Sequence, residues 1–151
     1  TLSKALGSQG GFVAVDDETR SLLVNEARSL VYSTGLSPVN AAVSREAVSL
    51  VRGDEGDALR ADLQENVELV RERVKDAGYE VYGDTHILPV VVGGAEEALS
   101  VADELRDHGV FAPAIRPPTV PEGTSRIRVS MTAAHTREDA ETVARAFEEA
   151  A

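Results

Sequence analysis

The first eleven residues read Thr1-Leu2-Ser3-Lys4-Ala5-Leu6-Gly7-Ser8-Gln9-Gly10-Gly11, and they say more about the fold and the chemistry than any other stretch. Lysine is scarce: the chain has 15 basic residues, and only Lys4 and Lys75 among them are lysines. A lysine is used in place of an arginine where an amine must lose its proton and react, as in Schiff-base chemistry. Nearby glycines let the backbone approach a ligand closely. Lys4 is therefore a candidate reactive amine, and the alternative is a solvated lysine in a frayed terminal segment.

The length of 151 residues fits one domain or slightly more. The chain has no cysteine, which excludes disulfides, thiolate catalysis and cysteine-ligated metal sites. A net charge of −11 argues against a nucleic-acid partner, which would need clustered basic residues. No apolar run approaches the about 20 residues of a membrane span, so we expect a cytoplasmic protein with no membrane partner. The acidic, lysine-poor composition also suits a salt-adapted organism.

The N-terminal third is predicted to contain both strands and helices. The expected elements are a strand at 11–15, a helix at 18–27, a strand at 29–34 and a helix from Pro38 through Val51. Asp16 and Asp17 are suited to cap the first helix, and Pro38 is suited to begin the second. Gly53 and Gly56 interrupt that helix, so we expect a domain boundary at this point.

The remainder is predicted to alternate helices and strands. The expected elements are a helix at 57–77, a strand at 86–92, a helix at 95–108, strands at 110–114 and 125–131, and a helix ending at Ala150. Pro89 favours an edge position or a bulge for its strand, because proline lacks the N–H that a central strand uses. Thr136, with Asp139 three residues later, predicts a capping box. This order predicts a small α/β domain whose helices cover one face of a sheet.

The strand at 125–131 separates two kinds of side chain. Ile127, Val129 and Met131 fall on one face, whereas Arg126, Arg128 and Ser130 fall on the other.

Two arginines are candidates for binding a carboxylate. Arg116 precedes two prolines that stiffen its backbone, and Arg128 lies on the polar face of the strand. Both suit a forked, bidentate contact with a carboxylate, and the alternative is an ordinary surface arginine in a weak ion pair. His135 is better placed as a structural residue at a helix start than as an acid–base group. His86 and His108 give no metal-ligand spacing with His135, so we expect no metal.

Three separated motifs together resemble one enzyme family. They are Thr1 to Gly11, Tyr32-Ser33-Thr34 with Pro38, and the run from Ile115-Arg116-Pro117-Pro118-Thr119-Val120-Pro121 through Arg126-Ile127-Arg128 to Thr132-Ala133-Ala134-His135-Thr136. In this order they are similar to the α-oxoamine synthases, which use pyridoxal 5′-phosphate (PLP). Within that family the chain most resembles the 8-amino-7-oxononanoate synthase branch, which serves biotin synthesis. The resemblance covers essentially the whole chain.

The resemblance implies a PLP-transferase fold of the aspartate-aminotransferase type. Residues 1–55 would be the end of the PLP-binding large domain, and residues 56–151 would be the small C-terminal α/β domain. Since the family's chains are much longer and this one begins at Thr1, we expect a fragment that is inactive alone and lacks the N-terminal half of the enzyme. The family also implies a homodimer with shared active sites.

The site residues follow from matching positions. Lys4 matches the lysine that forms the Schiff base with PLP and moves protons at the substrate α-carbon. Thr1 matches a hydroxyl that binds the cofactor phosphate, and Thr34 matches a residue that reaches the phosphate of the neighbouring subunit. Arg128 matches the arginine that binds the amino-acid carboxylate, and Arg116 and Thr119 match a loop lining the substrate channel.

The reaction implied is the decarboxylative condensation of L-alanine with a pimeloyl thioester to 8-amino-7-oxononanoate. Two alternatives stay open. One is a sister enzyme that uses glycine or serine, such as 2-amino-3-ketobutyrate ligase or serine palmitoyltransferase. The other is a non-catalytic module that keeps the fold without the chemistry.

Overall fold

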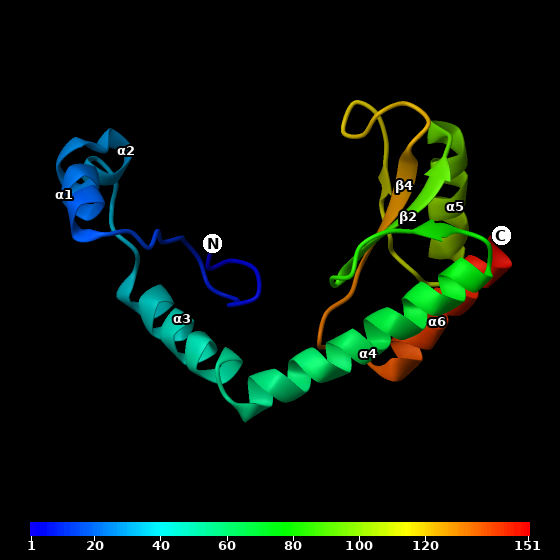
Figure 1. Cartoon of the computed structure of the whole chain (residues 1–151), viewed down its shortest axis with the longest axis horizontal. Coiled ribbons are helices and arrows are strands. Elements are labelled where there is room, and N and C mark those ends of the chain that lie inside the picture. The colour runs from blue at the N-terminus through cyan, green and yellow to red at the C-terminus, as the bar shows by residue number, and fades with distance from the viewer. The chain divides into compact units, whose positions relative to one another are not determined.

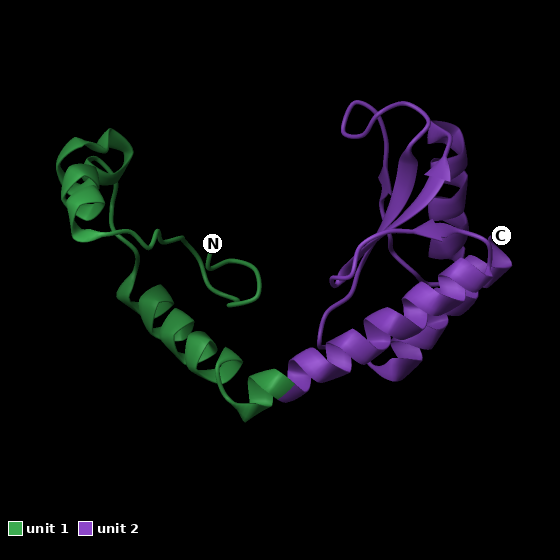
Figure 2. Ribbon diagram, in the orientation of Figure 1, with its two compact units in different colours: residues 1–57 green, residues 58–151 purple.

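The computed structural model describes residues 1–151, which divide into unit 1 (Thr1–Asp57) and unit 2 (Ala58–Ala151) (Figure 2). Unit 1 contains helices α1 (Asp17–Glu26), α2 (Arg28–Val31) and α3 (Pro38–Val51) and the start of α4 (Asp54–Asp76), which continues into unit 2. Unit 2 also contains β1 (Glu80–Val81), β2 (Ile87–Gly93), α5 (Ala95–Asp107), β3 (Ala114–Ile115), β4 (Ser125–Ser130) and α6 (Arg137–Glu149). The assignment of residues 1–55 and 56–151 to a large and a small domain stays a prediction.

Unit 2 is built on an antiparallel sheet with the strand order β1-β2-β4-β3. Helix α5 contacts β2, β3 and β4, and α4 and α6 lie side by side (Figure 1). The three helices and one face of the sheet share a single core. Its largest fully buried side chains are Phe147, Leu88, Leu105, Ile127, Met131, Val67, Val70, Val74 and Val90. The expected small α/β domain with helices on one sheet face is confirmed.

The helices of unit 2 begin and end for the predicted reasons. The hydroxyl of Thr136 accepts a hydrogen bond from the N–H of Asp139, whose carboxylate accepts one from the N–H of Thr136 in return, which is the predicted capping box. In α4, Val67, Val70 and Val74 recur every three or four residues and are all fully buried.

Pro89 lies in a central strand, so the expectation of an edge position was wrong. β2 pairs with β1 on one side and with β4 on the other, and the register shift falls between Val91 and Gly93. The N–H of Arg128, opposite Pro89, donates instead to the carbonyl of Pro113 on its other side. The missing N–H of Pro89 therefore breaks no hydrogen bond with β4.

Two predicted strands of unit 1 are absent. Residues 11–16 have no regular structure, and Phe12 and Val13 are exposed, because unit 1 holds no strand with which they could pair. Residues 28–31 form helix α2, in which the N–H groups of Val31 and Tyr32 donate to carbonyls four residues earlier. In unit 2 the strand predicted at 110–114 is shorter than expected and lies at its C-terminal end, as β3 at Ala114–Ile115.

Unit 1 has almost no core of its own. Among its large apolar side chains only Leu2 is buried. More than a dozen are exposed, including Phe12, Val13, Leu22, Val24, Leu30, Tyr32, Val39 and Val43. An apolar surface of this extent is typical of a segment that packs against other polypeptide.

Candidate active site

The lysine stretch folds into a closed loop. The N–H of Leu2 donates to the carbonyl of Gly10 at 3.0 Å, and the N–H of Ser8 donates to the carbonyl of Leu2 at 2.9 Å. Inside this loop the N–H of Gly7 donates to the carbonyl of Lys4 at 3.0 Å. Leu2 is buried, so the two ends of the loop are fixed while Lys4 lies exposed between them.

The backbone conformation favours glycine at Gly10, and the side chain of Leu36 lies close to it. Its φ of 109° lies in the region that side chains rarely adopt, and a Cβ there would come within 2.6 Å of Leu36 Cδ1. Leu36 therefore packs directly on the loop backbone. The hydroxyl of Ser8 also donates to the carbonyl of Asn40 at 3.0 Å, which ties the loop to the start of α3. The Lys4 loop is thus a built feature rather than a frayed terminus.

The Lys4 loop also presents hydroxyl groups beside the amine. The hydroxyls of Thr1 and Ser3 are 2.9 Å apart, and the N–H of Ser3 donates to Thr1 Oγ1. The Lys4 amine makes no hydrogen bond or ion pair. An unengaged amine beside two exposed hydroxyls fits a ligand that carries both a carbonyl and a phosphate.

Thr34 lies after α2, is exposed, and forms no hydrogen bond or ion pair with the Lys4 loop. It precedes Leu36, which packs on that loop, so the two segments are neighbours in unit 1. The structure does not bring the side chains of Thr1 and Thr34 together.

A second group of predicted residues lies in unit 2, on the sheet face opposite the core. Ile127 and Val129 of β4 are buried, whereas Arg128 is exposed and Arg126 is partly buried, so the predicted division of the strand's faces is confirmed. Arg128 is opposite Pro89 on one side and bonded through its backbone to Pro113 on the other. Its guanidinium makes no hydrogen bond or ion pair and is therefore available to a ligand.

Arg116 and Thr119 lie in the loop that joins β3 to β4. The N–H of Thr119 donates to the carbonyl of Arg116, and Thr124 closes the far end of the loop through two hydrogen bonds to the carbonyl of Pro121. Both side chains are exposed. Arg116 follows Ile115, the register partner of Arg126, so the loop begins beside β4.

The face opposite the core also holds residues that the sequence did not single out. The hydroxyl of Tyr82 donates to the carboxylate of Glu80, which raises the pKa of Tyr82, while the charge of Arg126 acts in the opposite direction. The Nε–H of Arg126 donates to the carbonyl of Thr124 at 3.0 Å. The alternation in β4 already placed Arg126 beside Arg128, and this was the signal that could have marked it.

His135 has a structural role. Its Nδ1 accepts a hydrogen bond from the N–H of Thr132, and its carbonyl accepts one from the side-chain amide of Asn66 on α4. No three His, Cys, Asp or Glu side chains are arranged to hold a metal ion. None of the helices is both long enough and apolar enough to cross a membrane.

Residues 1–147 match the aminotransferase class I and II family. The chain belongs to this family. It is 46% identical over 140 residues to the 8-amino-7-oxononanoate synthase of Pelobacter propionicus, with 92% of this chain and 36% of that protein aligned. This class I and II aminotransferase chain therefore spans about a third of the length of the relatives that it matches.

Solved structures agree with the family. One is a structure of serine palmitoyltransferase (SPT) with a PLP internal aldimine, which is 26% identical to this chain and has a TM-score of 0.90. The match covers 99% of this chain and 38% of the SPT chain. The 8-amino-7-oxononanoate synthase of Francisella tularensis, 21% identical, has a TM-score of 0.82 over 98% of this chain and 43% of the other, and it shows the fold alone. The expected PLP-transferase fold and the resemblance to α-oxoamine synthases are confirmed, while the roles of the individual residues stay predictions.

Proposed function

We propose that this chain supplies the reactive lysine and the small domain of a PLP-dependent acyltransferase that condenses L-alanine with a pimeloyl thioester. The single observation that carries this proposal is the 46% identity over 140 residues to an 8-amino-7-oxononanoate synthase. The closed Lys4 loop and the unpaired Arg128 support it, because both are built and neither is used within the chain.

The residues of unit 1 fit the cofactor. Lys4 would link to its carbonyl carbon, Thr1 would donate a hydrogen bond to its phosphate, and Thr34 would bind the phosphate of a neighbouring subunit in a homodimer. When bound, PLP withdraws electrons from the substrate α-carbon and so permits the loss of carbon dioxide. The Lys4 amine, freed from the cofactor by the amino acid, would carry a proton to or from that carbon.

The residues of unit 2 would hold the substrates. Arg128 would bind the alanine carboxylate through two parallel hydrogen bonds and so orient the bond that breaks. Arg116 and Thr119 would line the passage by which the acyl donor enters. In the reaction the alanine α-carbon bonds to the acyl carbon, the thiol leaves, and the alanine carboxylate leaves as carbon dioxide.

A direct test joins this chain to the preceding segment of the Pelobacter propionicus synthase, in place of the segment that the chain matches. With PLP present, alanine, glycine and serine are each paired with pimeloyl, acetyl and palmitoyl thioesters. The proposal predicts the highest kcat/KM for alanine with the pimeloyl thioester. A clear preference for glycine or serine would contradict it.

We also propose that the assembled enzyme is cytoplasmic.

The likeness to SPT favours a second candidate, a sister enzyme that uses serine with a long acyl chain. The chain is 26% identical to SPT and 46% identical to the oxononanoate synthase, so the first candidate is preferred. The substrate matrix separates the two. A non-catalytic module would give no turnover with any pair.

A further inference from the structure

The arginines of unit 2 fall into two groups. Those on the helices mostly pair with carboxylates at 2.7 to 3.3 Å, namely Arg71 with Glu68, Arg73 with Glu148, Arg106 with Asp103 and Arg137 with Glu141. The three around the uncovered sheet face, Arg116, Arg126 and Arg128, have no carboxylate partner.

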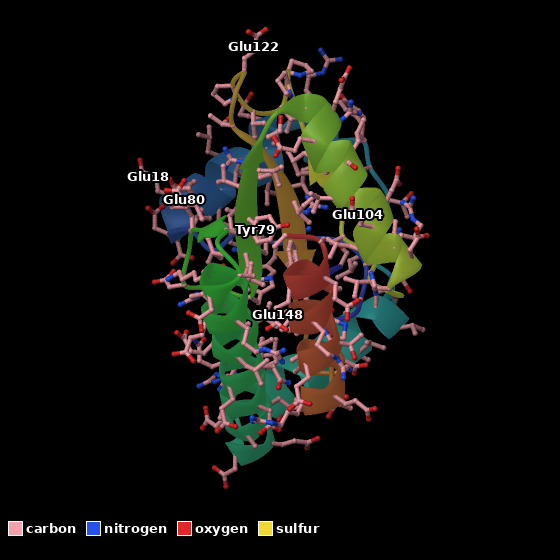
Figure 3. The ribbon with its side chains drawn as sticks, turned by 90° about the vertical axis from the view of Figure 1, so that its right-hand side faces the viewer. Glu18, Tyr79, Glu80, Glu104, Glu122 and Glu148 are labelled. Atoms are coloured by element: carbon pink, nitrogen blue, oxygen red, sulfur yellow. The ribbon has the colours of Figure 1, made fainter.

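The absence of partners for these three is unexpected in so acidic a chain. It holds 26 acidic and 15 basic residues, so carboxylates outnumber the basic side chains that could pair with them. Glu80, on β1 and separated from β4 by β2, accepts a hydrogen bond from Tyr82 instead. Glu122 projects outward from the tip of the β3–β4 loop (Figure 3). The three guanidinium groups are therefore free to bind an anion from outside the chain.

Arg126 is the most rigidly held of the three. Its Nε–H is committed to the carbonyl of Thr124, which fixes the plane of the guanidinium and leaves its terminal nitrogens without a partner. Its register partners are Val91 and Ile115, so apolar side chains lie on both sides of its stem. Arg128 is two residues further along the same face, at a backbone spacing of about 7 Å.

We propose that Arg126 binds the carboxylate at the far end of the acyl donor and so selects dicarboxylic acyl chains. This inference rests on the proposed function. The product named 8-amino-7-oxononanoate keeps one carboxylate, from the acyl donor, whereas the alanine carboxylate is lost. Two carboxylates therefore need two cationic sites, and Arg128 accounts for one. The apolar flanks Val91 and Ile115 suit the methylene chain that precedes the second carboxylate.

The test compares two acyl donors of equal length in the joined enzyme described above. Pimeloyl thioester ends in a carboxylate, whereas heptanoyl thioester ends in a methyl group. The wild-type sequence should prefer the pimeloyl donor by about tenfold in kcat/KM, as one added charge-assisted contact would give. Arg126→Gln should remove this preference by lowering the pimeloyl value alone, and Arg126→Lys should retain part of it.

The kinetic test uses Arg145→Gln as a matched control. Arg145→Gln changes an exposed arginine on α6 that bonds only to Thr142, and it should leave both donors unaffected. If Arg126→Gln lowers both donors equally, or neither, the inference is wrong. If the wild-type sequence shows no preference for the pimeloyl donor, both the proposed function and this inference are wrong. This wild-type comparison is measured before any variant is made.

A binding measurement keeps the inference testable if the variants of the joined enzyme do not fold. Pimelate and heptanoate are titrated into the full chain while the Nε–Hε signals of its arginines are followed by NMR. Pimelate should perturb Arg126 and Arg128 together and bind more tightly than heptanoate, and Arg126→Gln should abolish the difference. Equal binding of the two acids to the wild-type chain would overturn the inference.

Discussion

At the scale of single residues, the chain holds two chemically distinct groups that nothing inside it uses. Lys4 is an exposed amine on a closed loop, and Arg128 is an unpaired guanidinium between two prolines. Both were singled out from the sequence, because residue type and local rigidity can be read there. Arg126 was not, since its bond to Thr124 depends on how the loop folds back.

Arg128→Lys tests the carboxylate contact. Lysine keeps the charge but offers no planar fork, so the bidentate contact is lost. We expect the KM for alanine to rise about tenfold or more in the joined enzyme, with little change in the KM for the thioester. Arg145→Lys on α6 is the control and should change neither constant. An unchanged KM for alanine would show that Arg128 does not bind the amino acid.

At the scale of elements, helices were predicted better than strands. The spacing of Val67, Val70 and Val74 defines α4 because the partner surface lies in the same unit. The apolar run at 11–15 has no partner strand in unit 1, so it forms no strand there. The edge position predicted for the Pro89 strand was wrong. A proline is tolerated in this central strand because the N–H of Arg128, its partner in β4, bonds to the other side.

The joint between α3 and α4 depends on one glycine. A Cβ at Gly56 would lie 2.6 Å from the carbonyl oxygens of Leu50 and Val51, which are backbone atoms and cannot move aside cheaply. In the joined enzyme, where we expect α3 to be ordered, Gly56→Ala should lower the free energy of unfolding by about 1–2 kcal/mol, measured by urea denaturation. Gly53→Ala is the matched control, because its Cβ would meet carbonyl oxygens only at 3.6 Å. Equal stabilities of the two variants would contradict the close contact.

The packing of α4 against α6 should depend on pH. Two hydrogen bonds from Arg73, at 2.8 and 2.7 Å, hold the pKa of Glu148 below its usual value. A carboxyl whose folded pKa is lowered stabilises the fold above its unfolded pKa, near 4.3, and loses that contribution as the pH falls through the folded value. Wild-type stability should therefore fall below about pH 4 more steeply than that of Glu148→Gln. Parallel profiles would show that the pair contributes nothing.

At the scale of the whole chain, the two units differ in what they can bury. Unit 2 encloses a core of fully buried residues, whereas unit 1 buries one large apolar side chain, Leu2. The chain also spans only 36% of its relative from Pelobacter propionicus. The motifs of the sequence predicted the family, while the near absence of a core in unit 1 became visible only in the structure.

Hydrogen exchange should show this difference directly. In the chain alone, backbone amides of β4 and of the buried turns of α4 should be protected, while those of α1 and α3 should exchange within the shortest labelling time. Joining the chain to the preceding segment of its relative should slow exchange in α1 and α3. Strong protection of unit 1 in the chain alone would contradict the view that it needs other polypeptide.

The central claim is that Lys4 carries the cofactor. The most direct measurement is intact and peptide mass of the joined enzyme after incubation with PLP and reduction with borohydride. We predict one reduced cofactor adduct on the peptide that contains Lys4, which Lys4→Ala removes and Lys75→Ala on α4 retains. An adduct on Lys75, or no adduct on either lysine of this chain, would contradict the claim.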